Sequence, residues 1–287
     1  MSPSLLAEHP CFSAECKPNF GRLHLPVAPV CNIFCRFCSR GLSPDITLPG
    51  QALRVISPGE ALGVAETAMT LCPEIRVAGV AGPGDPLASP DALDCLTLIK
   101  SRHPRIMTCL STNGLNLYPL MERIVGAGVR TVTVTVNACD PAVSAEINRG
   151  VKINGKVTAG IKAAEILYEA QKKGVLECKR RGILVKVNCV LVPGVNLDHA
   201  PRVAETAASW GADLMNLIPL APASAMAHLA APTKEEADEA ARLCQKHLPV
   251  KRDCMRCRSD ACGIPGVTEH RRELYGADAD QETFSHG

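Results

Sequence analysis

Short apolar runs alternate with longer helix-like stretches along most of this chain. The six runs with strand character are Leu23–Val27, Ile75–Val80, Met107–Ser111, Thr131–Val136, Leu184–Leu191 and Leu214–Pro219. The stretches rich in Ala, Leu and Glu, with apolar residues three or four positions apart, predict helices at Ser57–Leu71, Pro90–Arg102, Leu117–Ala127, Lys156–Lys179, Asp198–Trp210 and Thr233–Leu248. Strands that alternate with helices form parallel sheets, so the pattern predicts an α/β fold, a partial (βα)6 TIM-like barrel.

The length of 287 residues suits one large domain, and no interdomain linker interrupts the βα pattern. We expect residues 1–263 to form the barrel with cysteine-bearing extensions at both of its ends. Residues 264–287 are predicted to be a polar C-terminal tail without fixed structure. Thr233 with Glu236 three positions later has the spacing of a helix capping box.

The cysteine content indicates the compartment and the class of protein. Fifteen cysteines are an odd number, and no charged-then-apolar leader opens the chain, so a secreted disulfide framework is disfavoured. In a reducing cytoplasm, clustered cysteines indicate metal ligands and scattered ones indicate small buried hydrophobes. A net charge of +2 gives no indication of a nucleic-acid surface, and no apolar run reaches the ~18–20 residues that span a bilayer. We therefore expect a cytoplasmic, metal-bearing protein without nucleic-acid or membrane partners.

Cys31, Cys35 and Cys38 form a C-x3-C-x2-C triplet, with Phe37 before the last thiol. Three such thiolates can hold three corners of one cubane iron–sulfur cluster and leave the fourth iron open for chemistry. A structural zinc site usually needs two C-x2-C hooks, and none follows until Cys254. The triplet resembles the signature of radical S-adenosylmethionine (SAM) enzymes. In these enzymes the open iron holds the amino and carboxylate groups of SAM, and an electron from the cluster cleaves its sulfonium to a 5′-deoxyadenosyl radical.

A glycine-rich loop follows the second predicted strand, with the sequence Gly79-Val80-Ala81-Gly82-Pro83-Gly84-Asp85-Pro86. Glycines allow the backbone to approach a ligand closely. In the radical SAM enzymes this strand end carries a Gly-Gly-Glu-like motif that binds the amino group of SAM, and Gly82 and Asp85 occupy that place here. The alternative interpretation is an ordinary βα turn.

Small polar residues mark the ends of the next two predicted strands. They are Ser111, Thr112 and Asn113 after the third strand and Asn137 after the fourth. Such side chains at strand ends suit contacts with ribose, carboxylate or adenine, although Asn-Gly is also a plain turn pair. Asn188 and Asn216 stand inside apolar runs, where each needs a buried partner or a ligand. The sequence leaves these two alternatives open.

Ten of the twelve remaining cysteines fall into three groups. Cys254 and Cys257 form a C-x2-C hook with Cys262 five residues further on, which favours a second metal cluster. The cysteines inside predicted helices and strands are expected to be buried hydrophobes: Cys72, Cys95, Cys178, Cys189 and Cys244. Cys16 and Cys139 stay unassigned.

The order of motifs from about Glu8 to about Gly263 resembles the NifB family of nitrogenase cofactor maturases, and specifically its short, single-domain members. The runs that carry the resemblance are His9–Cys11, Gly21–Pro29, the triplet, Ala81–Leu87, Cys109–Gly114, Thr133–Ala138, Val185–Asn188, Met215–Leu220 and Cys254–Ala261. Several of these runs are typical of that family rather than of radical SAM enzymes in general.

The resemblance implies an enzyme of lyase or transferase type that fuses two 4Fe–4S clusters, with carbide insertion, into the eight-iron precursor of the nitrogenase iron–molybdenum cofactor. Besides SAM and the radical 4Fe–4S cluster, it implies one or two auxiliary 4Fe–4S clusters. Cys11 and Cys109 match the family's ligands to one of these, and Cys254 and Cys257 match those to the other. The implied partners are iron–sulfur cluster donor and cofactor carrier proteins, and a reductant such as ferredoxin or flavodoxin.

The chain departs from the family at one place. The family normally follows the triplet with a Cys-Asp-Asn-Glu-type motif, whereas Ser39–Ile46 contains no cysteine. The missing thiolate is either replaced, with Cys16, His9 or His24 as alternatives, or the first auxiliary site is lost. In the second case the chain is a divergent NifB-like radical SAM enzyme that acts on a small molecule or peptide. A non-catalytic iron–sulfur carrier is a third hypothesis.

Overall fold

One curved sheet organises the molecule. The computed structural model describes residues 8–12, 19–38, 50–251 and 257–276. Its large sheet has eight strands in the order β10-β9-β8-β5-β4-β3-β1-β11. Seven of them run parallel, and six of these are the predicted strands: β1 (Gly21–His24), β3 (Ile75–Val80), β4 (Met107–Thr112), β5 (Val129–Thr135), β8 (Leu184–Leu191) and β9 (Leu214–Pro219). Because they follow one another in chain order around a curved sheet, the predicted partial (βα)6 barrel is confirmed.

Two short strands extend the sheet at its edges. β10 (Val250–Lys251) pairs in parallel with β9. At the other edge, β11 (Cys262–Gly263) pairs antiparallel with β1, with Cys262 opposite Leu23. A segment close to the C-terminus therefore lies beside the first strand of the barrel.

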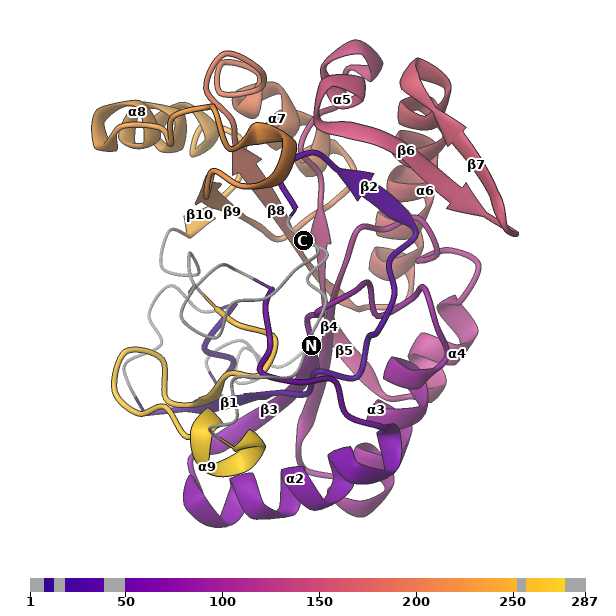
Figure 1. Ribbon diagram of the computed structural model, residues 1–287, viewed down its shortest axis with the longest axis vertical. Helices are drawn as coiled ribbons and strands as arrows, with labels where there is room; N and C mark the ends of the chain where they lie inside the picture. The colour runs from indigo at the N-terminus through magenta and orange to yellow at the C-terminus, as the bar shows by residue number, and fades with distance from the viewer. Residues whose placement is uncertain (1–7, 13–18, 39–49, 252–256, 277–287) are drawn as a thin grey trace.

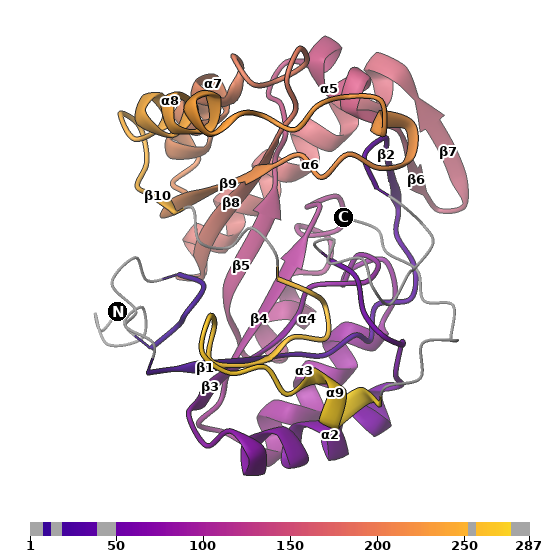
Figure 2. The same cartoon turned by 60° about the vertical axis from the view of Figure 1, so that its left-hand side comes forward.

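The main helices lie along the outside of the curved sheet, as Figures 1 and 2 show. They are α2 (Pro58–Leu71), α3 (Asp91–Arg102), α4 (Met121–Gly126), α6 (Gly160–Arg180), α7 (Ala200–Ser209) and α8 (Lys234–Cys244), with a short 3-10 turn, η1 (Ser224–Met226), between the last two. The predicted capping box at α8 is confirmed, since the backbone N–H of Glu236 donates to the Thr233 hydroxyl at 3.1 Å and that of Thr233 to the Glu236 carboxylate at 2.7 Å. None of the helices in the described residues is long and apolar enough to cross a bilayer.

Strand alternation separates the core from an inner cavity. On β5, Val132 and Val134 belong to the hydrophobic core beneath the helices, whereas Thr133 and Thr135 line the cavity. On β8 the buried Lys186 likewise faces the cavity. The outward face of each strand therefore stabilises the fold, and the inward face is available for function.

A second, antiparallel sheet with the order β2-β6-β7 was not predicted. Its strands are β2 (Ile33–Cys35), β6 (Asn148–Ile153) and β7 (Lys156–Ala159), and α5 (Pro141–Ile147) leads into it. The prediction of a helix from Lys156 was wrong for its first four residues, which form β7. Asn154 and Gly155 have φ angles of 48° and 80°. This Asn-Gly pair makes the tight hairpin turn that joins β6 to β7, a signal that the sequence contained.

The segment after β11 is ordered up to residue 276. It contains α9 (Arg271–Tyr275), and the buried Tyr275 donates its hydroxyl hydrogen to the His24 carbonyl at 2.8 Å. The prediction of a tail without fixed structure was therefore wrong for residues 264–276, because one aromatic side chain anchors a polar segment to β1. Residues 277–287 lie outside the described residues.

Candidate functional site

A cavity lies inside the curved sheet, against the carboxyl-terminal halves of the parallel strands. This is the location expected for a site in a barrel fold. The predicted site residues that line it are His9, Cys11, His24, Cys38, Asp85, Cys109, Ser111, Thr112, Asn113, Asn188 and Cys257. The other predicted residues within the described ranges, Cys31, Cys35, Gly82, Asn137, Asn216 and Cys262, lie outside this lining. Cys16 and Cys254 fall outside the described residues.

The triplet wraps around β2. Cys35 ends this strand and is opposite Asn148 of β6, and the backbone N–H of Cys38 donates to the Cys35 carbonyl at 3.4 Å. The chain therefore turns back on itself between its second and third thiols. Pairing with β6 fixes the middle cysteine, so the small unpredicted sheet serves as the support of the triplet.

The triplet thiols lie in an environment that opposes ionisation. Burial, the Asp85 carboxylate and the Cys38 thiol raise the pKa of Cys31 to about 12. Burial, the other two thiols of the triplet and Asp85 also raise the pKa of Cys35 well above its ordinary value. Thiolates in such a place need a nearby cation, and iron–sulfur clusters supply iron to them. The donor set therefore fits an iron–sulfur cluster.

The loop after β3 holds the segment that leads into the triplet. The Gly82–Pro83 peptide is cis, and Gly82 has a φ of 135°, which suits glycine. The backbone N–H of Gly84 donates to the Ala28 carbonyl at 2.6 Å, and that of Asp85 to the Val30 carbonyl at 2.8 Å. A Cβ at Gly84 would collide with the Val30 carbonyl. The glycines thus allow a close backbone contact just before Cys31.

Asp85 joins the ends of β3 and β4. Its carboxylate accepts hydrogen bonds from the Leu87 N–H at 2.8 Å, the Thr112 hydroxyl at 2.9 Å and the Asn113 N–H at 2.6 Å. The Asn113 amide in turn donates to the Asn32 side-chain oxygen at 2.7 Å and lies 3.8 Å from the Cys31 sulfur. Asp85 and Asn113 therefore connect the predicted SAM-binding strand ends to the first cysteine of the triplet.

The three predicted asparagines of the later strands differ in their partners. The Asn137 side-chain oxygen accepts the Val190 N–H at 2.9 Å, which is a structural contact. Asn188 faces the cavity and accepts a hydrogen bond from the Asn216 amide at 3.2 Å. The Asn216 oxygen is buried without a hydrogen-bond partner among the described residues. Asn188 and Asn216 therefore form one buried pair, of which only Asn188 reaches the cavity.

A second group of thiols lines the cavity from other parts of the chain: Cys11, Cys109 and Cys257. Cys109 on β4 is in register with Gly79 on β3, where an added Cβ would overlap the Cys109 sulfur. A glycine at this position therefore leaves room for the thiol.

Cys257 lies among basic side chains. Its sulfur is 3.6 Å from Nδ1 of His24, and the Arg22 guanidinium is also close to it. Burial would lower the pKa of His24, but the Cys257 thiolate raises it, and the net shift is upward. Burial would also lower the pKa of Arg22, but the negative charges of Cys257 and Cys11 outweigh burial, and the pKa of Arg22 is raised. The surroundings of this second group favour negative charge.

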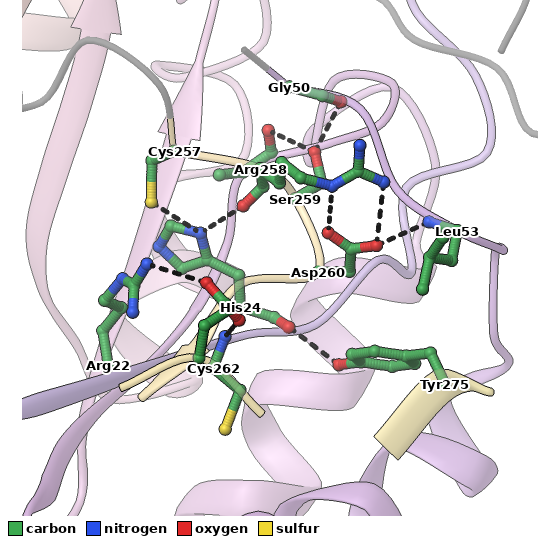
Figure 3. A network of polar contacts seen from close by, with 12 residues as sticks. Arg22, His24, Gly50, Leu53, Cys257, Arg258, Ser259, Asp260, Cys262 and Tyr275 are labelled. Atoms are coloured by element: carbon green, nitrogen blue, oxygen red, sulfur yellow. Dashed lines mark hydrogen bonds and ion pairs between the residues drawn. The ribbon is translucent and has the colours of Figure 1, made fainter. Parts of the chain in front are cut away.

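Figure 3 shows how the segment after Cys257 is anchored. Arg258 donates to the Asp260 carboxylate at 2.9 and 3.2 Å, and this fully buried carboxylate also accepts the Leu53 N–H at 2.5 Å. The Ser259 hydroxyl donates to the Gly50 carbonyl at 2.6 Å. We call Arg258, Ser259 and Asp260 the clasp, because together they hold residues 50–53 against the segment that carries Cys257.

Cys262 belongs to the core rather than to the cavity. It is fully buried in β11, and Figure 3 shows its thiol pointing away from that of Cys257. Burial and the neighbouring Cys72 thiol raise the pKa of Cys262 to about 12. The structure thus gives no support to Cys262 as a ligand.

The prediction of buried positions is confirmed for Cys72, Cys95, Cys178, Cys189 and Cys244.

Two basic residues near the second group of thiols were not singled out from the sequence. Lys186 on β8 is buried, and its ammonium group lies 3.2 Å from the Cys11 carbonyl and 5.2 Å from the centre of the Phe12 ring. Arg22 on β1 is also buried. Lys186 stands in the apolar run Leu184–Leu191, and a charge in such a place is the signal that could have identified it, whereas β1 contains only one large apolar residue and gives no such signal for Arg22.

Within the described residues, no three His, Cys, Asp or Glu side chains are arranged to ligate a single metal ion. The fit of the triplet to a cluster therefore rests on its spacing, its burial and the mutual charge effects of its thiols.

Comparison with known proteins agrees with this site. The sequence profile of the Radical SAM superfamily matches residues 25–207. The FeMo cofactor biosynthesis protein NifB of Methanocaldococcus infernus is 37% identical over 273 residues, which cover 94% of this chain and 90% of that protein. NifB of Methanocaldococcus jannaschii is 39% identical over 258 residues, which cover 89% and 86% of the two chains.

Among solved structures, a radical SAM methyltransferase from Sphaerobacter thermophilus aligns with a TM-score of 0.59 and 17% sequence identity over 86% of this chain and 71% of that one. This likeness shows the fold, and the two sequence comparisons confirm the resemblance found from the motifs. The chain belongs to the Radical SAM superfamily and, within it, to the NifB family.

Proposed function

We propose that this protein is a radical SAM enzyme of nitrogenase FeMo cofactor biosynthesis that fuses two 4Fe–4S clusters, with carbide insertion, into an eight-iron precursor. The observation that carries the proposal is the shared cavity: a thiol of the triplet, Cys38, and the separate thiols Cys11, Cys109 and Cys257 line the same space. A radical generated at the triplet would therefore act where other clusters are held. Membership of the NifB family supports the same assignment.

In this proposal Cys31, Cys35 and Cys38 hold the resident 4Fe–4S cluster, which together with SAM supplies a 5′-deoxyadenosyl radical when bound. Asp85 and Asn113 position the first thiol through the hydrogen bonds described above. The polar residues at the end of β4 and Asn188 offer donors and acceptors to SAM at the cavity wall.

The substrate clusters would be held by the second group of thiols. Cys11 and Cys109 are assigned to one cluster, and Cys257 with Cys254 to the other. Lys186 and Arg22 compensate the negative charge that thiolate-bound clusters bring into a buried space.

Hydrogen bonds favour His24 over His9 as the nitrogen ligand on this side of the cavity. Nδ1 of His24 is 2.8 Å from the Arg258 carbonyl, which only accepts, so this nitrogen carries the hydrogen and the neutral ring has a free lone pair on Nε2. Metal-binding histidines are commonly held in this way. Nδ1 of His9 accepts the Cys11 N–H at 3.1 Å, so its neutral ring carries the hydrogen on Nε2. We infer that His24 serves as a nitrogen ligand on the Cys257 side of the cavity.

Anaerobic reconstitution tests the function. Three 4Fe–4S clusters require about 12 irons per chain, and SAM labelled in its methyl carbon should transfer that carbon into an iron–sulfur product. Electron paramagnetic resonance should resolve a signal that changes on SAM addition. About 4 irons per chain, with no labelled cluster, would overturn the proposal.

The absence of a cysteine in Ser39–Ile46 favours one other function, that of a divergent radical SAM enzyme acting on a small molecule or peptide. This segment lies outside the described residues. The divergent enzyme would release 5′-deoxyadenosine only when an organic substrate is present. The maturase would release it with its clusters alone, so the two functions separate in a single assay.

Radical SAM enzymes need a reductant, and for this chain we propose ferredoxin or flavodoxin. Proteins that donate iron–sulfur clusters and a carrier that accepts the product complete the proposed set of partners.

A further inference from the structure

A basic hairpin projects from the barrel next to the triplet. We define it as residues 148–162, which form β6, β7 and the start of α6. Its basic residues are Arg149, Lys152, Lys156 and Lys162, all of them exposed, and it contains no Asp or Glu. Lys162 forms an ion pair with Glu165 of α6 at 3.2 Å, so the excess of positive charge is carried by Arg149, Lys152 and Lys156. The whole chain carries a net charge of only +2, so this hairpin is a local concentration of positive charge.

The hairpin also exposes large apolar side chains. Ile153, Val157 and Ile161 are 40%, 55% and 56% exposed. Lysines on an edge strand such as β7 protect a protein from aggregation, but apolar side chains beside them have the opposite effect. Apolar residues surrounded by like charges are instead typical of a surface that binds a partner of opposite charge.

The hairpin lies directly over the triplet. β6 pairs with β2, which places Asn148 opposite Cys35 and Val151 opposite Ile33. A surface depression is lined by Cys35 and Cys38 on one side and by Arg149, Gly150 and Val157 on the other. Cys38 also lines the inner cavity. The triplet therefore separates the cavity from this outer depression.

We propose that the basic hairpin docks an acidic electron-donor protein, which reduces the cluster at the triplet from the outside. The inference rests on the proposed radical function. One electron leaves the donor, which is oxidised, and enters the 4Fe–4S cluster, which is reduced; no bond forms or breaks in this step. Electron transfer requires a short distance, and the depression brings a docked surface next to Cys35 and Cys38. A small, charge-steered interface suits a partner that must leave after each turnover.

The test uses the reconstituted holoprotein with Lys152→Glu and Lys156→Glu combined. The initial rate of 5′-deoxyadenosine formation is measured with reduced flavodoxin or ferredoxin and, separately, with dithionite. At low ionic strength the protein-driven rate should fall about tenfold or more, because steering changes association rates by that order. The dithionite-driven rate should stay unchanged. Added salt should slow the wild-type protein with the protein donor but affect the variant much less.

Lys234→Glu, which reverses one lysine charge at a distant site, is the control. Lys234 is exposed at the start of α8, on the opposite side of the molecule from β7 in Figures 1 and 2. It should leave both rates unchanged. Val157→Ser tests the apolar part without changing charge and should weaken donor binding measured by titration.

Three outcomes would overturn the docking proposal: equal loss with dithionite, equal loss in the Lys234 control, or no loss with the protein donor. A wild-type holoprotein that cannot cleave SAM even with dithionite would instead overturn the proposed function, and this inference with it.

Discussion

The two groups of thiols around one cavity lie in opposite electrostatic surroundings. On the triplet side, the charged neighbour that acts on Cys31 and Cys35 is the buried Asp85 carboxylate. On the other side, Cys257 lies close to Arg22 and His24. A negative charge thus opposes ionisation of the thiols in the triplet, whereas positive charges favour the thiolate form of Cys257.

The contrast indicates different relations to metal. Burial and Asp85 raise the pKa of Cys31, so this thiol ionises readily only when iron is bound to it. Such a site suits a cluster that stays bound. The second group keeps compensating charges from the protein itself, with Lys186 beside Cys11 and Arg22 beside Cys257. Such a place can receive an anionic cluster and release it without exposing uncompensated charge. We expect a resident cluster at the triplet and substrate clusters at the second group.

Cys35→Ala breaks the triplet side of the comparison and should have the largest effect. Cys35 is the proposed ligand that β2–β6 pairing fixes, so its loss would remove one corner of the proposed cluster and the site at which SAM would bind. We expect 5′-deoxyadenosine formation to drop to the level of a no-enzyme control. The second group should still bind iron, which an iron assay on the same sample measures. Retained SAM cleavage would show that the triplet is not the radical site.

Cys257→Ala and Cys262→Ala sharpen the comparison within one short segment. Cys257 lines the cavity and Cys262 lies in the core. The first variant should lose about four irons per chain, one cluster, while SAM cleavage with dithionite persists. The second should keep its iron and lose only ~1–2 kcal/mol of unfolding free energy. If Cys262→Ala loses the iron instead, the assignment of the two thiols is reversed.

Asp260→Asn tests whether the clasp holds the second group in place. The buried carboxylate accepts hydrogen bonds from Arg258 and from the Leu53 N–H, and the variant removes the negative charge of this buried ion pair. We expect a loss of ~3–5 kcal/mol of unfolding free energy in thermal or denaturant unfolding. In the holoprotein, the signal of the cluster at Cys257 should change while that of the triplet is kept. Glu239→Gln, which removes an exposed ion pair with Arg242, is the control and should change neither.

Most of the barrel could be predicted from the sequence because most of its strands are short runs rich in apolar residues that alternate with helical stretches. The bounds of β3, β8 and β9 are those predicted, since strands buried on both faces have few polar residues to blur their ends. The small sheet was missed because β2 has three residues and β7 is exposed, so neither shows a hydrophobic pattern. α9 was missed for a related reason: one buried aromatic, Tyr275, anchors an otherwise polar segment.

The site residues that belong to motifs of fixed sequence spacing could be predicted. Those whose position depends on the three-dimensional fold could not. The triplet and the separate cysteines Cys11, Cys109 and Cys257 follow from motifs, and the cavity brings all three of the latter together. Cys262 is five residues from Cys257, yet it lies in β11, pairs with β1 and belongs to the hydrophobic core. The role of Lys186 depends on which face of β8 points inward, and sequence spacing alone does not show this.

The smallest effect expected concerns the ionisation of Cys31 in the cluster-free protein. Because burial and Asp85 raise its pKa to about 12, little thiolate exists near neutral pH, and alkylation should be slow. The rate should rise about tenfold per pH unit up to that pKa. Asp85→Asn removes a negative charge that opposes ionisation of Cys31. The Cys31 thiolate is then more stable, so the pKa of Cys31 falls and the whole rate profile moves to lower pH. Mass spectrometry of alkylated peptides measures this.

A loosened loop would also speed alkylation of Cys31, but in a different way. Opening the site raises the rate at every pH without moving the midpoint, whereas a charge effect moves the midpoint itself. Asp198→Asn, at an exposed position after β8, should leave the profile unchanged. A profile in Asp85→Asn that keeps its midpoint would mean that Asp85 acts on the triplet only through its hydrogen bonds to Thr112 and Asn113. The electrostatic contrast between the two groups of thiols would then rest on the basic side alone.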